Sequence, residues 1–219
     1  LTLTATLSNV ADEDVTVSLS TSGAATEGTD YTDGSGNLDD ITISAGSTTG
    51  TVSFSPTDDS VYEDDEAAVI AIDTVSGADA TESGTQSVTV TITENESAPT
   101  VTLSVSATSI AENAGSSLTL TATLSKTAAE NVTVTLGTSG SATEGTDYGS
   151  LSNITVTAGS LTGTTTFTPT DDSLYDATSN ETATVSIDSV SGGDALENGT
   201  QSVTITITDN ESAPTVTLS

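Results

Sequence analysis

Carboxylate side chains are the groups in this sequence that could do chemistry. The stretch PTDDSVYEDDE at residues 56–66 holds six of them in eleven residues. The whole chain has 32 acidic residues against one basic residue, Lys126, and a formal net charge of −31. Clustered carboxylates with no amine nearby suit Ca²⁺, which takes about six to eight oxygen ligands. The pattern therefore predicts Ca²⁺ binding, and Mg²⁺, which usually keeps several waters, fits it less well.

The missing residue types exclude several other kinds of chemistry. The sequence has no Cys and no His, so a catalytic thiol, a Ser–His–Asp triad and the usual zinc ligands are absent. Aromatic residues make up only 3% of the chain, which leaves few rings for stacking on sugars or bases. A single basic residue cannot neutralise a phosphate backbone. We therefore expect a protein that is not an enzyme and that binds no nucleic acid.

The sequence repeats itself with a spacing of roughly 113 to 117 residues. LTLTATLS at 1–8 returns at 118–125, and PTDDSVY at 56–62 returns as PTDDSLY at 169–175. A period this long indicates whole domains in tandem, because solenoid repeats are about 20–50 residues long. We expect three segments: a repeat lacking its first strand over 1–97, a complete repeat over 98–212, and the first strand of a following repeat at 213–219.

Within each repeat, apolar residues alternate with Thr and Ser. A period of two means that one face of a strand is buried and the other is solvated. Gly, Asp, Asn and Ser fill the gaps between strands as turn residues. About seven such strands in each repeat predict an all-β fold of tandem antiparallel β-sandwiches. The aromatic residues recur at equivalent places and are expected in the core or at its edge: Tyr31, Phe54, Tyr62, Tyr148, Phe167 and Tyr175.

The acidic residues concentrate in particular loops and strand ends, which a sandwich gathers at its two ends. In the first repeat, the candidate metal ligands are Asp30, Asp58, Asp59, Glu63, Glu66, Glu94 and Glu96. In the second repeat, they are Glu112, Asp147, Asp171, Asp172, Asp176, Asp209 and Glu211. Asp64 and Asp65 do not return in the second repeat, and we expect them to face solvent.

Two motifs of the repeat resemble those of the Calx-beta domain family. Gly28, Asp30 and Tyr31 form a Gly-x-Asp-Tyr motif, and an Asp-Asp-x-x-x-Glu-x-x-Glu motif begins at Asp58 and ends at Glu66. The resemblance covers nearly the whole repeat. It implies immunoglobulin-like sandwiches with Ca²⁺ at one end, and it implies that the seven candidates of the second repeat are the ligands there.

The sequence departs from the family pattern in two places, and alternatives remain open. In the second repeat, Asp176 replaces the Glu of the motif and Glu181 stands two residues late; the first repeat has no counterpart of Glu112 within the chain. The charge run can equally form a solvated loop, and Glu112 can be a surface residue. Asp30 and Asp147 can be turn residues bonded to the backbone, and the ENES and DNES segments can be linker.

The expected function is a calcium-binding structural repeat of an extracellular or cell-surface rod, adhesin stalk or fibre, in which Ca²⁺ stiffens the domains and their joints. The alternative is a carbohydrate- or protein-binding adhesion module without obligatory calcium. The expected partners are neighbouring repeats of the same chain, and identical chains head-to-tail if residues 213–219 complete the sheet of another copy. No stretch approaches the roughly 20 apolar residues of a membrane-spanning helix, so we expect no membrane insertion.

Overall fold

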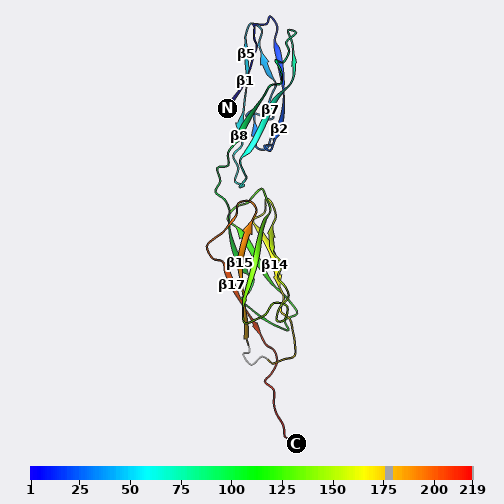
Figure 1. Cartoon of the computed structure of the whole chain (residues 1–219), viewed down its shortest axis with the longest axis vertical. Coiled ribbons are helices and arrows are strands. Elements are labelled where there is room, and N and C mark those ends of the chain that lie inside the picture. Colours follow the sequence, from blue (N-terminus) through cyan, green and yellow to red (C-terminus); the bar gives the residue numbers. More distant parts are fainter. Residues whose placement is uncertain (176–179, 219) are drawn as a thin grey trace. The chain divides into compact units, whose positions relative to one another are not determined.

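The regular elements of the described residues are β-strands (Figure 1). The computed structural model describes residues 1–175 and 180–218. Its strands form two compact units: the first comprises Leu1–Asp59 and Asp64–Asn95, and the second comprises Ser60–Glu63 and Glu96–Ser219. Within the described part of the chain, no helix has the length and hydropathy needed to cross a bilayer.

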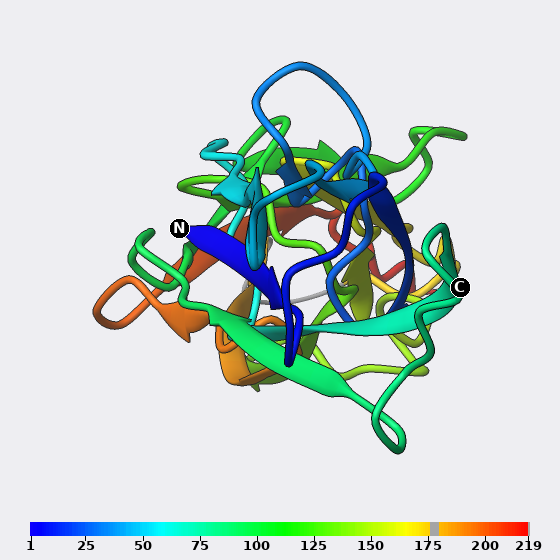
Figure 2. The ribbon, with the colours of Figure 1, turned by 90° about the horizontal axis from the view of Figure 1, so that it is seen from above.

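The first unit is built from three antiparallel sheets. The largest has the strand order β4-β2-β7-β8, and its strands are β2 (Val15–Gly23), β4 (Ile41–Ile43), β7 (Glu66–Ser76) and β8 (Ser87–Ile92). Two further pairs complete the unit. β1 (Thr2–Thr6), the blue strand beside the N mark in Figure 2, pairs with β5 (Thr49–Ser53), and β3 (Tyr31–Thr32) pairs with β6 (Ser55–Pro56).

The second unit is a sandwich of two larger sheets. One has the order β10-β17-β15-β12-β13, with β10 (Ser109–Ala111), β12 (Val132–Gly140), β13 (Ile154–Val156), β15 (Asn180–Ser191) and β17 (Ser202–Thr208). The other has the order β14-β11-β9-β16, with β9 (Thr100–Val105), β11 (Leu118–Leu124), β14 (Thr162–Phe167) and β16 (Leu196–Glu197). The pairs β10–β17 and β16–β9 are parallel, and the other pairings between named strands of this unit are antiparallel.

The alternation of apolar and hydroxyl residues places the core as the sequence predicts. In β11, the buried positions are Leu118, Leu120, Ala122 and Leu124, whereas Thr119 between them is exposed. The second unit has one continuous cluster of buried apolar side chains drawn from both sheets. These observations confirm the predicted all-β fold of tandem sandwiches.

Four of the six aromatic residues lie in the core. Tyr148 stacks on Phe167 with ring centroids 4.7 Å apart, and Tyr31 stacks on Phe54 at 4.6 Å. The prediction was wrong for Tyr175, which is 39% exposed. It lies beyond β14 in the DDSLY loop, so neither sheet covers its ring. Tyr62, its counterpart in DDSVY, is half-buried.

A glycine at the end of a central strand shapes the loop that carries the Gly-x-Asp-Tyr motif. Gly140 ends β12 with φ of +125°, and a Cβ there would lie 2.0 Å from the carbonyl oxygen of Thr182. Gly23 ends β2 in the same way, with φ of +114°. Directly after the turn, the N–H of Ala142 donates to the Thr182 carbonyl at 3.0 Å. Only glycine adopts this conformation without strain, so it fixes where the loop leaves the sheet.

Candidate metal centre

A parallel strand pair brings two candidate ligands of the second unit side by side. β10 pairs with β17 so that Ala111 lies opposite Thr208. The next residues along the two strands are Glu112 and Asp209, and the N–H of Glu112 extends the ladder by donating to the Thr208 carbonyl at 3.1 Å. Because the strands run in the same direction, both chains leave the sheet at the same end. The parallel pairing therefore places the Glu112 and Asp209 carboxylates at the same end of the sheet.

Glu211 completes a group of three carboxylates at this end of the unit. Each of Glu112, Asp209 and Glu211 offers an oxygen that lies within 4.8 Å of the others. Glu112 is only 9% exposed, and it is the buried polar side chain of the described residues. Asp209 and Glu211 are half-buried. Burial of a carboxylate is costly unless the charge is compensated, so this group requires a partner.

Backbone and amide donors hold the three carboxylates in position without supplying a full positive charge. The N–H of Asn210 donates to Glu112 Oε1 at 3.2 Å, and the N–H of Glu211 donates to Asp209 Oδ1 at 2.8 Å. Asn210 Nδ2 donates to Glu211 Oε1 at 2.8 Å. Glu211 Oε2 is shielded from solvent and has no hydrogen-bond partner among the described residues. One buried oxygen of the group is therefore left without a donor.

The proximity of three carboxylates changes the ionisation of Glu211. Carboxyl–carboxyl hydrogen bonding to Glu112, and then to Asp209, raises the pKa of Glu211 from 4.5 to about 7. Desolvation and repulsion by the two neighbouring charges act in the same direction. An oxygen-only set of this kind matches the ligand preference of Ca²⁺ and lacks the nitrogen and sulfur that zinc and copper prefer.

In the first unit, Asp30 and Glu66 approach each other. Glu66 begins β7 and is half-buried; desolvation raises its pKa, and the charge of Asp30 and a hydrogen bond with it add to the effect. Asp30 also accepts the N–H of Thr26 through Oδ2 at 2.5 Å. Asp147 accepts the N–H of Thr143 at 2.6 Å in the same way. Both motif aspartates thus close a turn with one oxygen, as the alternative interpretation predicted, while Asp30 also faces a second carboxylate.

The Asp-Asp pairs lie on exposed loops. Asp58 accepts a hydrogen bond from Asn95 Nδ2 at 2.8 Å, and Asp172 accepts one from the N–H of Leu174 at 2.6 Å. Asp59 and Asp171 are exposed as well. None of the four belongs to the three-carboxylate group found in the second unit. Asp172 therefore closes a turn of its own loop, whereas Asp58 contacts the segment after β8. The role of the four aspartates as ligands stays a prediction.

The remaining candidates lie in segments between strands or outside the described residues. Glu94 and Glu96 are half-buried residues of the segment that follows β8. Glu63 is also half-buried and lies in the segment Ser60–Glu63, which belongs to the second unit. Asp176 lies outside the described residues.

Two acidic residues, Glu181 and Asp65, have places in the structure that the sequence did not predict. Glu66 pairs with Ile92 in the β7–β8 ladder, and Glu181 pairs with Ile207 in the β15–β17 ladder. Since VTVTI and VTITI are the same part of the repeat, Glu181 occupies the strand position of Glu66. The extra two residues belong to the preceding loop, and counting backwards from the strand would have revealed the match.

Asp65 is the second missed residue. It is exposed, as expected, yet its Oδ1 accepts the N–H of Glu94 at 2.9 Å. The carboxylate therefore tethers the start of β7 to the segment after β8. Nothing in the sequence signalled this contact, because the two residues lie 29 positions apart.

Comparison with known proteins identifies the repeat. Residues 2–96 and 94–211 each match the Calx-beta domain. Among solved structures, the apo form of the Calx CBD1 domain aligns with a TM-score of 0.44 at 16% identity, covering 52% of this chain and 99% of that chain. CBD12 from CALX1.2 aligns with a TM-score of 0.39 at 16% identity, covering 94% of this chain and 92% of that one. Invasin, a bacterial integrin-binding protein, aligns with a TM-score of 0.40 at 17% identity, covering 95% of this chain and 36% of that chain. No curated protein matches the chain.

Proposed function

The chain belongs to the Calx-beta domain family, as two domains in tandem, and from this premise we propose that it is a calcium-binding structural repeat. The observation that carries the proposal is the group formed by Glu112, Asp209 and Glu211, three carboxylates within 4.8 Å of one another. One of them is buried, and another has a shielded oxygen without a donor. In the first domain, Asp30 and Glu66 form another pair of neighbouring carboxylates, at different positions of the repeat.

Calcium binding would act on the strand pair that carries the ligands. When bound, the ion would supply the positive charge that three neighbouring carboxylates lack, and it would compete with protonation of Glu211, whose pKa is raised to about 7. Glu112 follows β10 and the other two ligands follow β17, so neutralising their charges would favour the folded pairing of these strands. A ligand that binds the folded state alone stabilises that state by mass action.

Heat unfolding with added calcium tests the proposal. We expect millimolar Ca²⁺ to raise the unfolding midpoint of the chain, and NaCl at equal ionic strength to raise it less, because salt only screens charge. Glu112→Gln should remove most of the calcium-specific increase in the unfolding midpoint. The matched control is Asp188→Asn, which removes one charge from an exposed position of β15 in the same domain. An identical response to the two salts would refute calcium binding.

The wider role that we propose is a segment of an extracellular or cell-surface rod, adhesin stalk or fibre, rather than an enzyme, a nucleic-acid-binding protein or a membrane-inserted one. The tandem domains and the net charge of −31 support it. Calcium sites of extracellular modules have dissociation constants of about 10⁻⁴–10⁻³ M, so we expect weak binding in that range. Small-angle scattering during the same titration should show a narrower range of particle dimensions with Ca²⁺; an unchanged range would contradict stiffening.

A further inference from the structure

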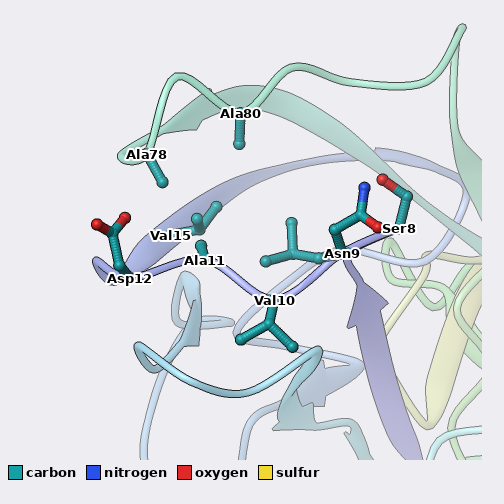
Figure 3. Close-up of a pocket in the computed structure, with 9 residues that line it drawn as sticks. Ser8, Asn9, Val10, Ala11, Asp12, Val15, Ala78 and Ala80 are labelled. Atoms are coloured by element: carbon teal, nitrogen blue, oxygen red, sulfur yellow. The ribbon is translucent and has the colours of Figure 1, made fainter.

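The first domain has a hollow of about 380 Å³ beside the loop that follows β1. Figure 3 shows Ala78 and Ala80 on one wall and the segment Ser8–Asp12 on the other. Val15 also lines the hollow, and Val10 is 61% exposed. The volume falls within the roughly 300–1,000 Å³ of small-molecule pockets, and the lining combines aliphatic side chains with the polar residues Ser8, Asn9 and Asp12. The hollow contains none of the carboxylates of the candidate metal centre.

The repeat identifies the equivalent place in the second unit, where a tyrosine is bound. Leu7–Val15 corresponds to Leu124–Val132, and VSGADA at 75–80 corresponds to VSGGDA at 190–195. In the second unit, Tyr62 forms a parallel bridge with Ala128. Its N–H donates to the Thr127 carbonyl, and its carbonyl accepts from the N–H of Ala129, both at 2.9 Å.

The tyrosine ring is also anchored through its hydroxyl. Tyr62 Oη donates to Asp194 Oδ2 at 2.9 Å. Asp194 stands in a left-handed conformation with φ of +46°, an uncommon backbone state for a residue other than glycine. The left-handed conformation is part of the turn that places the Asp194 carboxylate within hydrogen-bond distance of Tyr62. The second unit thus binds a Ser-Val-Tyr segment through two backbone hydrogen bonds and one side-chain hydrogen bond.

The first domain offers the same set of contact groups. Asp79, the counterpart of Asp194, has φ of +49°. Val10 and Asp12 take the places of Thr127 and Ala129, and within the described residues neither the Val10 carbonyl nor the Asp12 N–H makes a hydrogen bond. An edge of this kind, with an unpaired backbone donor and acceptor beside a hollow, is suited to pairing with another chain segment.

A matching segment is exposed on the same chain. DDSLY at 171–175 repeats DDSVY at 58–62. Leu174 is 70% exposed and Tyr175 is 39% exposed, so both side chains are accessible to another chain. The residue changes between the repeats are complementary as well. The parallel bridge sets Val61 beside Thr127 in the second unit. Leu174 takes the place of Val61, and Val10 takes the place of Thr127. The larger donor side chain therefore matches the more apolar acceptor.

We propose that the hollow lined by Leu7–Asp12, Ala78 and Ala80 binds the Leu174–Tyr175 segment of a second copy of this chain. Tyr175 enters the hollow and donates its hydroxyl to Asp79, and its backbone pairs with Val10 and Asp12. Donor and acceptor are different surfaces, so the contact is heterologous and propagates head-to-tail. The proposal rests on the repeat and the hollow, and it does not depend on calcium.

Association through one loop is weak, and the charge of each copy opposes it. Two chains of net charge −31 repel each other at low ionic strength. Near 1 M salt the Debye length falls to about 3 Å, and the repulsion is largely screened. The contact should therefore be measured at high protein concentration and high salt, by a method that traps transient pairs.

Disulfide trapping suits this chain because it contains no cysteine. We would mix chains carrying Val10→Cys with mass-tagged chains carrying Leu174→Cys, in EDTA and 1 M NaCl, and quantify mixed disulfide dimers on non-reducing gels. The matched control replaces the acceptor by Thr119→Cys, an exposed position of β11 away from the hollow. We expect at least a fivefold excess of mixed dimer over the control.

A second change isolates the tyrosine. Tyr175→Ser added to the Leu174→Cys chain should reduce the mixed dimer to the control level, whereas Tyr175→Phe should retain part of it because the ring still fills the hollow. Circular dichroism of each variant establishes that the fold is intact. Equal trapping at Val10 and Thr119, or trapping unaffected by Tyr175→Ser, would overturn the proposal. Because EDTA is present throughout, neither result bears on calcium binding at the metal centre, which the heat-unfolding experiment tests separately.

Discussion

Glu211 couples the stability of the calcium-free fold to pH. Its pKa is raised to about 7 by hydrogen bonding with Glu112 and then with Asp209, whereas 4.5 is its ordinary value. The folded state therefore binds a proton more tightly than the unfolded state does. The contribution to stability is fully present below about pH 4.5 and is lost as the pH rises through about 7.

We expect Glu211→Gln to flatten this dependence, because the amide is neutral at every pH. In EDTA, the unfolding midpoint of the unmodified chain should fall between pH 5 and pH 8 by more than that of Glu211→Gln. Asp188→Asn should retain the slope of the unmodified chain, since the exposed carboxylate that it removes lies outside the group. Parallel slopes for the unmodified chain and Glu211→Gln would show that the carboxyl cluster does not hold a proton.

Individual residues also show what sequence reasoning could and could not supply. The resemblance implied Glu112, Asp209 and Glu211, and the parallel β10–β17 register explains why they meet. The same reasoning could not foresee that Asp58 bonds to Asn95, because a side-chain partner 37 residues away depends on how two loops pack. A motif records residue types and spacing, whereas hydrogen-bond partners on loops come from tertiary structure.

Among the elements, the strands were the most predictable feature. Alternation of Leu and Thr in β11 reports one buried face, and the core residues follow from it. Register across a loop was harder to predict. Counted from the Asp-Asp pair, Glu181 stands two residues late, yet it lies opposite Ile207 just as Glu66 lies opposite Ile92. Inserted residues accumulate in the loop, since a shift of register would turn the buried face of the strand outward.

The glycine that ends β12 provides a test at the scale of the element. Gly140→Ala would place a Cβ 2.0 Å from the Thr182 carbonyl oxygen at φ of +125°, so we expect a loss of about 1–3 kcal/mol in the free energy of unfolding. The control is Gly149→Ala, where φ is not in the left-handed range and the nearest atom lies 3.9 Å away. Urea denaturation measures the free energy of unfolding of both variants. A Gly140→Ala variant as stable as Gly149→Ala would show that the strand end adjusts freely.

At the scale of the whole molecule, the two domains differ in how their cores are built. The second unit has one continuous cluster that contains Tyr148 and Phe167. In the first unit, the buried side chains divide into two smaller clusters, one around Val15 and Ile43 and the other around Tyr31 and Phe54. A larger continuous core removes more apolar surface from water. The second domain should therefore be the more stable of the two.

We accordingly expect calorimetry of the calcium-free chain to show two heat-unfolding transitions, with the lower belonging to the first domain. Removing a buried phenylalanine costs about 3–5 kcal/mol, so Phe54→Ala should lower the first transition and Phe167→Ala the second. Each variant serves as the control for the other, because Phe54 and Phe167 stack on different tyrosines in different clusters. A single transition that both substitutions lower equally would show that the two cores unfold as one cooperative unit, which their separate clusters do not predict.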